Sequence, residues 1–185
     1  MSLLSKLPKI RSQYKANVNL AMLSWFGTGG NAEIFLVLED EEDLVQFLRT
    51  CPEDVPLNIL GAGSNILVRD DGVSGVVIKL GGNFGQICIA DQGKPEITAG
   101  AAALDMHVAT FAHQHGISGL EFLSGIPGTI GGALRMNAGA YGHDTASVLV
   151  EVRAVTYRGE ICVLSADDLH YFYRHCKASE VVFVE

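Results

Sequence analysis

Residues 125–142 read GIPGTIGGALRMNAGAYG, and six of these eighteen residues are glycine. Pro127 fixes the backbone dihedral φ at one point, whereas Gly125, Gly128 and the pair Gly131 and Gly132 leave it free around that point. Such a loop is stiff and carries few side chains, so a flat or phosphorylated ligand can come close to the main chain. The pattern therefore predicts a ligand-binding loop.

A second glycine loop, LGAGSNILV, covers residues 60–68 and follows a predicted strand. It begins like the dinucleotide fingerprint G-x-G-x-x-G, but position 66 is Ile66 and the next residues continue as strand or turn instead of helix. Neither a Rossmann site nor a phosphate-binding loop with a Walker lysine is expected. Glycines followed by Ser64 and Asn65 can still form a nest of backbone N–H groups that binds an anion. The alternative is a tight turn, but two such loops in one short chain favour a ligand.

The composition indicates a globular protein with one domain or two small ones. The chain has 185 residues, of which 48% are apolar and 18% charged. Its net charge of -8 argues against a partner that is a nucleic acid or an anionic membrane surface, because both require a basic footprint. No apolar run approaches the ~20 residues that span a bilayer, and the first residues lack a secretory signal. We therefore expect a cytoplasmic protein.

No metal site and no disulfide framework are expected. The four cysteines stand far apart without a Cys-x-x-Cys pair, so we expect buried or inert thiols. His113 and His115 lie two residues apart in a predicted helix, and side chains at that spacing point to different faces.

The order of predicted elements changes near the middle of the chain. A strand over 32–38, a helix over 40–50 and strands over 56–60 and 75–80 give a β-α-β-β pattern. We then expect two strands within 85–100 around a turn at 91–94, a helix over 104–116, a hairpin over 148–165, a short helix opened by a capping box at 165–168, and a strand over 180–185.

This change of pattern defines the expected domain boundaries. Residues 1–19 are expected to form a polar leader, residues 20–80 a first subdomain and residues 81–185 a second one. The last strand is apolar and needs neighbours, so we expect the second subdomain to be incomplete and further chain to follow.

Four motifs carry a resemblance to a known family. In chain order, the four motifs are SWFGTGGNAE (24–33), LGAGSNILV (60–68), GLEFLSGIPGTIGGALRMNAGAYG (119–142) and YFYRHC (171–176). In this order and spacing, the chain from about Leu20 to Glu185 resembles the UDP-N-acetylenolpyruvoylglucosamine reductase family of flavoproteins.

The resemblance implies an α+β fold of the vanillyl-alcohol oxidase and para-cresol methylhydroxylase type. In this FAD-binding fold two α/β subdomains hold FAD between them, and the C-terminal substrate domain would be absent here. The resemblance assigns the FAD pyrophosphate to Gly61, Ala62, Gly63, Ser64 and Asn65. It assigns the flavin to Ser124, Gly125, Ile126, Pro127, Gly128, Thr129, Ile130, Gly131 and Gly132, with Asn137, Ala138 and Gly139 close by.

The implied activity is the reduction of UDP-N-acetylglucosamine enolpyruvate to UDP-N-acetylmuramate, a step in peptidoglycan precursor synthesis. NADPH would supply the hydride and FAD would carry it. Arg174 matches the family's catalytic arginine, and Tyr173 and Arg174 would contact the substrate. The family's protonating serine and its carboxylate partner would lie in the third domain, so we expect this chain to bind FAD weakly and to reduce the substrate poorly.

Two other functions remain open from the sequence. A different flavin oxidoreductase of the same fold would usually carry a flavin-linking His or Cys near the glycine loop, and residues 119–142 contain neither. A non-catalytic FAD-binding or nucleotide-binding module would bind flavin and show no activity with any complementing domain.

Overall fold

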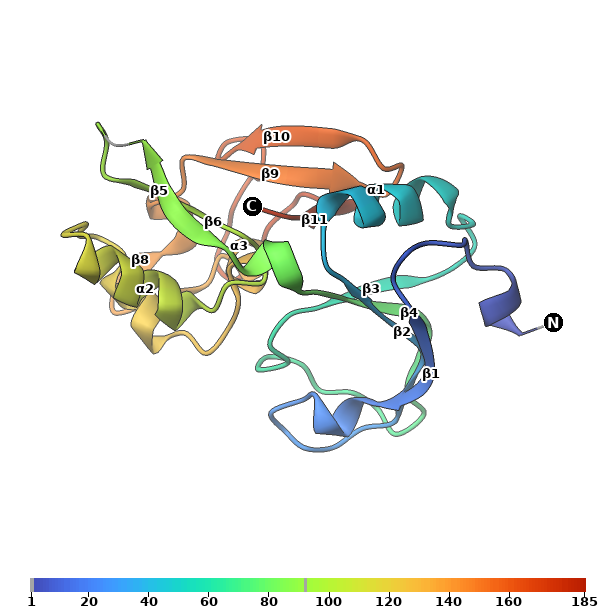
Figure 1. The fold of residues 1–185 in the computed structure, drawn as a ribbon. Helices are drawn as coiled ribbons and strands as arrows, with labels where there is room; N and C mark the ends of the chain where they lie inside the picture. The colour runs from blue at the N-terminus through green and yellow to red at the C-terminus, as the bar shows by residue number, and fades with distance from the viewer. Residues whose placement is uncertain (1, 92) are drawn as a thin grey trace.

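The first half of the chain builds a four-stranded sheet. The computed structural model describes residues 2–91 and 93–185. The sheet has the order β1-β2-β4-β3, with β2 parallel to β4 and β4 parallel to β3, while β1 is an antiparallel edge (Figure 1). The strands are β1 (Tyr14–Asn19), β2 (Asn31–Leu38), β3 (Leu57–Leu60) and β4 (Val73–Leu80).

Helix α1 (Glu41–Thr50) connects β2 to β3, so the predicted β-α-β-β order is confirmed. The carboxylate of Asp40 caps the helix by accepting a hydrogen bond from the N–H of Asp43 at 3.0 Å. Leu44, Phe47 and Leu48 are buried, which matches the apolar positions that predicted the helix.

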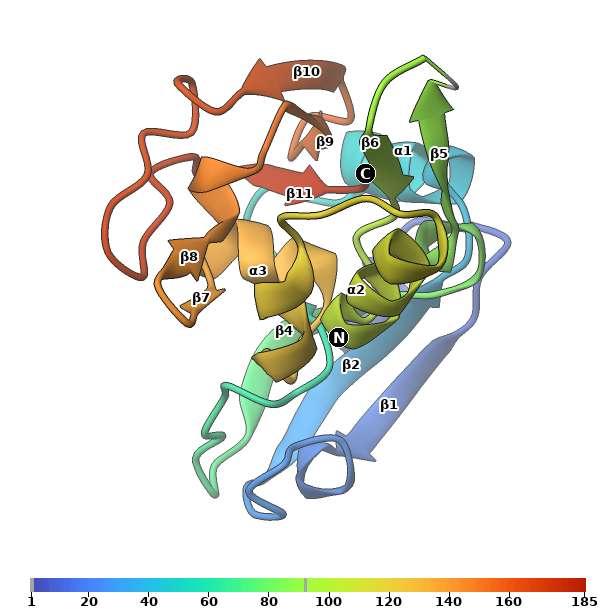
Figure 2. The same cartoon turned by 90° about the vertical axis from the view of Figure 1, so that its left-hand side faces the viewer.

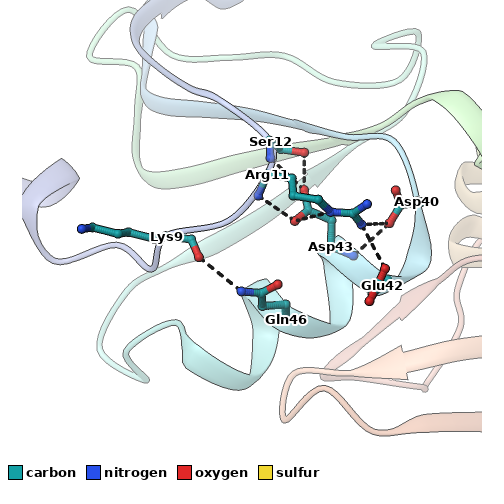
Figure 3. A network of polar contacts seen from close by, with 7 residues as sticks. All are labelled: Lys9, Arg11, Ser12, Asp40, Glu42, Asp43 and Gln46. Carbon is teal, nitrogen blue, oxygen red and sulfur yellow. Dashed lines mark hydrogen bonds and ion pairs between the residues drawn. The ribbon is translucent and has the colours of Figure 1, made fainter.

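Residues 14–19, which we expected in a polar leader, instead form the edge strand β1. Residues 9–12 bind the start of α1 (Figure 3). The buried carboxylate of Asp43 accepts hydrogen bonds from the backbone N–H of Arg11 at 3.1 Å, and from the N–H and the hydroxyl of Ser12. Arg11 also pairs with Asp40 at 2.7 Å. The polar side chains that suggested a leader are therefore the groups that attach this segment.

The second half of the chain contains two small antiparallel sheets and a two-stranded bridge. One sheet has the order β10-β9-β11 and the other pairs β5 with β6. The bounds are β5 (Ile87–Asp91), β6 (Glu96–Ala99), β7 (Gly139–Ala140), β8 (His143–Asp144), β9 (Glu151–Thr156), β10 (Ile161–Ser165) and β11 (Val181–Phe183). The predicted hairpins and the last strand are confirmed, but the turn predicted at 91–94 includes Gln92, which lies outside the described residues.

Helices α2 (Asp105–Gln114) and α3 (Ile130–Met136) lie beside each other next to these sheets (Figure 2). The helix predicted over 104–116 is confirmed as α2, and Gly116 follows it with a left-handed φ of +69°. Short 3-10 helices cover Leu3–Ser5, Leu20–Met22, Gly82–Gly85, Glu121–Gly125 and Thr145–Ser147.

The short helix predicted after residue 165 is wrong. Ser165 and Asp168 exchange hydrogen bonds as a capping box would, with the N–H of Ser165 donating to the carboxylate at 2.8 Å. However, residues 166–170 form turns. His170 then takes a left-handed φ of +43°, which no right-handed helix continues.

One apolar core joins the two halves of the chain. Leu36 and Leu44 from the first half share it with Val152, Val155 and Val182 from the second. An ion pair between Glu41 of α1 and Arg153 of β9, with 2.7 Å between their nearest atoms, lies beside this core. The subdomain boundary between residues 80 and 81 stays a prediction.

Candidate functional site

The two glycine loops meet at Gly61 and Thr129. Gly61 follows β3 directly, and Thr129 precedes α3. A Cβ atom built on Gly61 would lie 2.7 Å from the hydroxyl oxygen of Thr129, which is closer than real Cβ atoms approach. Glycine at position 61 therefore lets two segments that are distant in sequence form one surface.

The first loop is held by the segment that follows β1. Gly63 is buried and has a left-handed φ of +73°. A Cβ on Gly63 would collide with the carbonyl oxygen of Leu23, and the N–H of Trp25 donates to the carbonyl of Gly63 at 3.0 Å. Residues 61–65 thus keep a fixed path although they contain no regular element.

The second loop is held by main-chain bonds to residues 101–105. The N–H of Ile130 donates to Ala103 at 2.9 Å, the N–H of Gly131 donates to Ala101 at 2.9 Å, and the N–H of Asp105 donates to Gly128 at 3.1 Å. Because these bonds bind one side of the loop, the other side remains open, and Gly125 and Pro127 are exposed.

Asp105, a residue that the sequence analysis missed, lies beneath this loop. Its side chain is 0% exposed, and neither carboxylate oxygen has a hydrogen-bond partner among the described residues. Burial raises the pKa of this carboxyl group to about 7. A Cβ on Gly128 would stand 2.7 Å from its Oδ2, so Gly128 is needed for the loop to pass over this carboxyl group. An acidic residue in the first turn of a helix is common, so the sequence carries no signal for this site.

Arg174 reaches the other end of α3. Its guanidinium donates to the carbonyl of Asn137 at 3.2 Å through Nη1 and to the carbonyl of Gly139 at 2.7 Å through Nη2. The arginine itself has a left-handed φ of +54°, and its Cζ lies 5.2 Å from the centre of the Tyr173 ring. The predicted residues 137–139 and 173–174 are therefore neighbours.

Asn137 is the centre of this second group. It is 4% exposed and takes a left-handed φ of +42° at the end of α3. Its amide nitrogen donates to Asp144 at 3.1 Å and to the carbonyl of Phe172 at 3.2 Å, and its side-chain oxygen accepts from the N–H of Ala146 at 2.9 Å. One side chain thus joins residues 144–146 to Phe172, which lies two residues before Arg174.

The predicted site residues form two groups at the two ends of α3. A seven-residue helix is about 10 Å long, so Arg174 lies roughly one helix length from Thr129. The structure buries Gly63, Thr129 and Asn137, and it exposes Asn65, Ser124, Gly125, Pro127, Tyr173 and Arg174. The others are half-buried: Gly61, Ala62, Ser64, Ile126, Gly128, Ile130, Gly131, Gly132, Ala138 and Gly139.

Tyr141 is a further site candidate that the sequence analysis did not single out. It is 81% exposed, and a Cβ on Gly125 would lie 2.7 Å from its ring carbon Cε2. Its φ of +54° is left-handed. The closeness of Gly125 to the Tyr141 ring shows that this ring lies beside the exposed part of the second glycine loop.

The structure also shows the surroundings of His115 and of the cysteines. His115 stacks on Phe111 with ring centres 4.1 Å apart, and its Nδ1 lies 2.8 Å from the Phe111 carbonyl oxygen. Residues 2–91 and 93–185 contain no cluster of three His, Cys, Asp or Glu side chains suited to a metal ion. Cys176 is buried, Cys51 and Cys162 are half-buried, and Cys88 in β5 is exposed, so that the expectation of buried or inert thiols stays a prediction for Cys88. In the same residue ranges no helix has the length and apolar character to cross a membrane.

A family model described as an FAD binding domain matches residues 32–165. The UDP-N-acetylenolpyruvoylglucosamine reductase of Parvibaculum lavamentivorans is 50% identical over 185 residues, which are 100% of this chain and 59% of that relative. The match covers this chain from end to end, but it covers less than two thirds of the relative's length.

Solved structures agree with this relationship. The crystal structure of UDP-N-acetylenolpyruvylglucosamine reductase (MurB) from Thermus caldophilus is similar with a TM-score of 0.79 and 31% identity, covering 95% of this chain and 60% of that one. The structure of 6-hydroxy-D-nicotine oxidase from Arthrobacter nicotinovorans, at 14% identity and a TM-score of 0.59, shares the fold over 86% of this chain and 37% of its own. The α+β FAD-binding fold predicted from the sequence is confirmed. The chain belongs to the FAD binding domain family and is related over its whole length to UDP-N-acetylenolpyruvoylglucosamine reductases.

Proposed function

We propose that these residues form the FAD-holding part of an enzyme that uses NADPH to reduce UDP-N-acetylglucosamine enolpyruvate to UDP-N-acetylmuramate. The observation that carries this proposal is the approach of Gly61 to Thr129, which makes one surface from the two loops that the family resemblance assigns to FAD. The relative from Parvibaculum lavamentivorans, named as this reductase, supports the choice of reaction. The reaction would place the protein in peptidoglycan precursor synthesis in the cytoplasm.

The residues present fit a dinucleotide that is bound mainly by main chain. Where the two loops touch, a single Cβ at position 61 would fill the space between them. The surface that the loops offer to a ligand is therefore made mainly of backbone. Residues 61–65 and 124–132 include no Lys or Arg. We therefore assign the pyrophosphate to backbone N–H groups of residues 61–65 and the flavin to residues 124–132 and 137–139.

Arg174 would manage charge on the substrate. FAD, when bound, would supply hydride transfer from NADPH to the enolpyruvyl double bond. Addition of hydride to this double bond moves negative charge toward the substrate carboxylate, and a fixed guanidinium stabilises that charge better than water does. Two carbonyl groups hold the Arg174 guanidinium, which leaves donors free among its five N–H groups. Tyr173, which is 88% exposed beside it, is proposed as a second substrate contact.

The relative from Parvibaculum lavamentivorans has two fifths of its length outside the match, since the chain covers 59% of it. We propose that the proton donor and further substrate contacts lie in such additional chain. General acid catalysis contributes about 10²–10⁴-fold, so residues 1–185 alone should bind FAD and turn over the enolpyruvyl substrate slowly.

The test titrates the chain with FAD and follows quenching of the flavin fluorescence. It then follows NADPH oxidation anaerobically, with and without UDP-N-acetylglucosamine enolpyruvate, and with the remaining part of a full-length relative added. Saturable FAD binding together with substrate-dependent oxidation in the complemented sample supports the proposal. Absence of saturable FAD binding would refute it, and FAD binding without activity in any complemented sample would identify a non-catalytic module.

A further inference from the structure

Asp105 carries a buried carboxyl group that the fold leaves without a partner. Its side chain is 0% exposed, and neither of its oxygens has a hydrogen-bond partner among residues 2–91 and 93–185. By contrast, the buried carboxylate of Asp43 accepts hydrogen bonds from Arg11 and Ser12. Because an unpaired carboxylate in a protein interior is costly, nothing in the described part of the chain stabilises the ionised form of Asp105.

The backbone and the side chain of Asp105 both contact Gly128 in the second glycine loop. The Asp105 N–H donates to the carbonyl of Gly128 at 3.1 Å, and a Cβ built on Gly128 would stand 2.7 Å from Asp105 Oδ2. Their neighbours Leu104 and Thr129 form an antiparallel bridge. The carboxyl group is therefore packed against the main chain of this loop, and the loop must move if the carboxyl group changes its contacts.

Gly128 is next to the contact that joins the two glycine loops. The residue that follows it, Thr129, has its hydroxyl group against Gly61 of the first loop. Residues 61–65 and 124–132 contain no Lys or Arg that would offset a negative charge at Asp105. An ionised Asp105 would therefore repel an anion held by either loop.

The N–H of Gly128 is a donor for which an ionised Asp105 would compete. In the structure it donates to the carbonyl of Ile126 at 3.0 Å, which makes a three-residue turn around Pro127. A hydrogen bond to a charged acceptor is roughly twice as strong as one to a neutral carbonyl. Loss of the Asp105 proton therefore favours a second loop conformation, in which this N–H leaves Ile126 and the turn at Pro127 opens.

The uncharged state of Asp105 follows from burial and not from a neighbouring charge. Residues 101–104 and 126–129, which pack against it, contain no titratable side chain. The other titratable groups on the surrounding helices are exposed or already bonded: His107 and His113 on α2 and Glu121 in the segment Glu121–Gly125 are exposed, and Arg135 on α3 binds two main-chain carbonyl groups. Burial raises the pKa of Asp105 to about 7.

We propose that Asp105 is a positioning residue for the cofactor: its carboxyl group is neutral when the two glycine loops hold FAD, and it takes up a proton when FAD binds to the ionised protein. The proton comes from solvent and forms the O–H bond of the carboxyl group. Asp105 is covered by the loop, so it acts on the cofactor through Gly128 and Thr129. The inference rests on the proposed FAD site, and it does not depend on the substrate that the enzyme reduces.

Binding of FAD should weaken as the pH rises above about 7. If the pKa of Asp105 is higher in the complex than in the free protein, each pH unit between the two values raises the dissociation constant by up to about tenfold. Below about pH 6 the free protein already holds the proton, so Asp105 should contribute no pH dependence there. Fluorescence titration of the full chain with FAD from pH 6 to pH 9 measures this dependence.

Two variants separate Asp105 from other groups that titrate in this range. Asp105→Asn cannot ionise, so it should lose the rise of the dissociation constant above about pH 7. Asp167→Asn is the matched control, because Asp167 is exposed and its side chain makes no hydrogen bond or ion pair with the residues that the structure describes. It should keep the pH dependence of the wild type.

Proton uptake gives a second readout that a merely structural role of Asp105 would not change. Calorimetric titration with FAD at pH 7.5, in two buffers with different heats of ionisation, counts the protons taken up. The wild type should take up about 0.5–0.8 proton per FAD more than Asp105→Asn does. NMR of the aspartate carboxyl carbons in the wild type needs no variant, so it decides the question even if Asp105→Asn does not fold. The Asp105 titration should move to higher pH when FAD is added.

Three results would overturn the inference while FAD still binds. They are the same pH dependence in the wild type and in Asp105→Asn, equal proton uptake by the two proteins, and an Asp105 titration that FAD leaves in place or moves to lower pH. Absence of saturable FAD binding at every pH refutes the proposed function and this inference together. The FAD titration thus distinguishes failure of the cofactor site from failure of the role of Asp105.

Discussion

The main chain of Gly61 packs against the hydroxyl group of Thr129, so closely that a Cβ at position 61 would stand 2.7 Å from that oxygen. Gly61 directly follows β3 in the first half of the chain, and Thr129 directly precedes α3 in the second. The contact therefore couples the position of one glycine loop to that of the other. Cofactor affinity should depend on it.

Replacing Gly61 with alanine should push the two loops apart and weaken FAD binding. Overpacking typically costs about 1–3 kcal/mol, which corresponds to about 5- to 150-fold in the dissociation constant. Fluorescence titration with FAD measures the change. Gly85→Ala is the matched control, because a Cβ at Gly85 meets nothing within 4 Å.

A second substitution tests whether Thr129 causes the effect of Gly61→Ala. The Cβ of Thr129 is 3.9 Å from the added carbon, so Thr129→Ala removes the collision. The double variant should recover part of the affinity, giving a coupling energy of about 0.5–3 kcal/mol in a double-mutant cycle. Additive effects of the two substitutions would show that the loops are not coupled at this contact.

Asn137 should stabilise the Arg174 region through its backbone conformation as well as its side chain. Asn137→Gly keeps the left-handed backbone but loses three side-chain hydrogen bonds, which predicts a loss of about 1–3 kcal/mol in the free energy of unfolding. Asn137→Ala loses the same bonds and adds about 1–2 kcal/mol, because a left-handed residue with a Cβ is strained. Denaturation with urea measures both, and equal losses would contradict a role for the backbone.

Because of Asp105, the free energy of unfolding should fall as the pH rises through the acidic range. Its pKa in the folded protein is raised to about 7 by burial, whereas a carboxyl group in the unfolded chain titrates near ~3.9. Between these values the folded state holds a proton that the unfolded state has lost. The contribution of Asp105 is therefore fully present below about pH 4, decreases by about 1.4 kcal/mol per pH unit, and is lost above about pH 7.

Asp105→Asn removes this titration and leaves the shape nearly unchanged. The difference in unfolding free energy between wild type and variant should change with pH between about 4 and 7, and the variant should gain relative stability at the alkaline end. Urea denaturation across this range measures the difference. A difference independent of pH would mean that Asp105 is ionised in the folded protein.

The sequence predicted local features well and tertiary placement poorly. The α1 helix and the strands from β2 to β4 follow from periodicity and glycine boundaries, and both glycine loops were identified as candidate ligand loops. In contrast, Asp105 looked like an ordinary first-turn acid, because its burial comes from the loop at Gly128 that passes over it. The strand β1 was missed because its residues are mostly exposed and polar, and pairing with β2 rather than burial makes it a strand.

Asp43 should attach the N-terminal segment only while it is ionised. Burial alone would raise the pKa of this carboxyl group, but hydrogen bonds from Ser12 and Arg11 outweigh burial and lower it. A lowered folded pKa means that the contribution is present above the unfolded value near ~3.9 and is lost as the pH falls through the folded value. Asp43→Asn should therefore reduce the unfolding free energy by about 1–3 kcal/mol at neutral pH and by less in acid. Glu42→Gln is the control, since the Glu42 side chain is 86% exposed and its replacement should stay within about 0.5 kcal/mol. If Asp43→Asn costs as much in acid as at neutral pH, its effect comes from packing, and residues 9–12 are not held by the charge of this carboxylate.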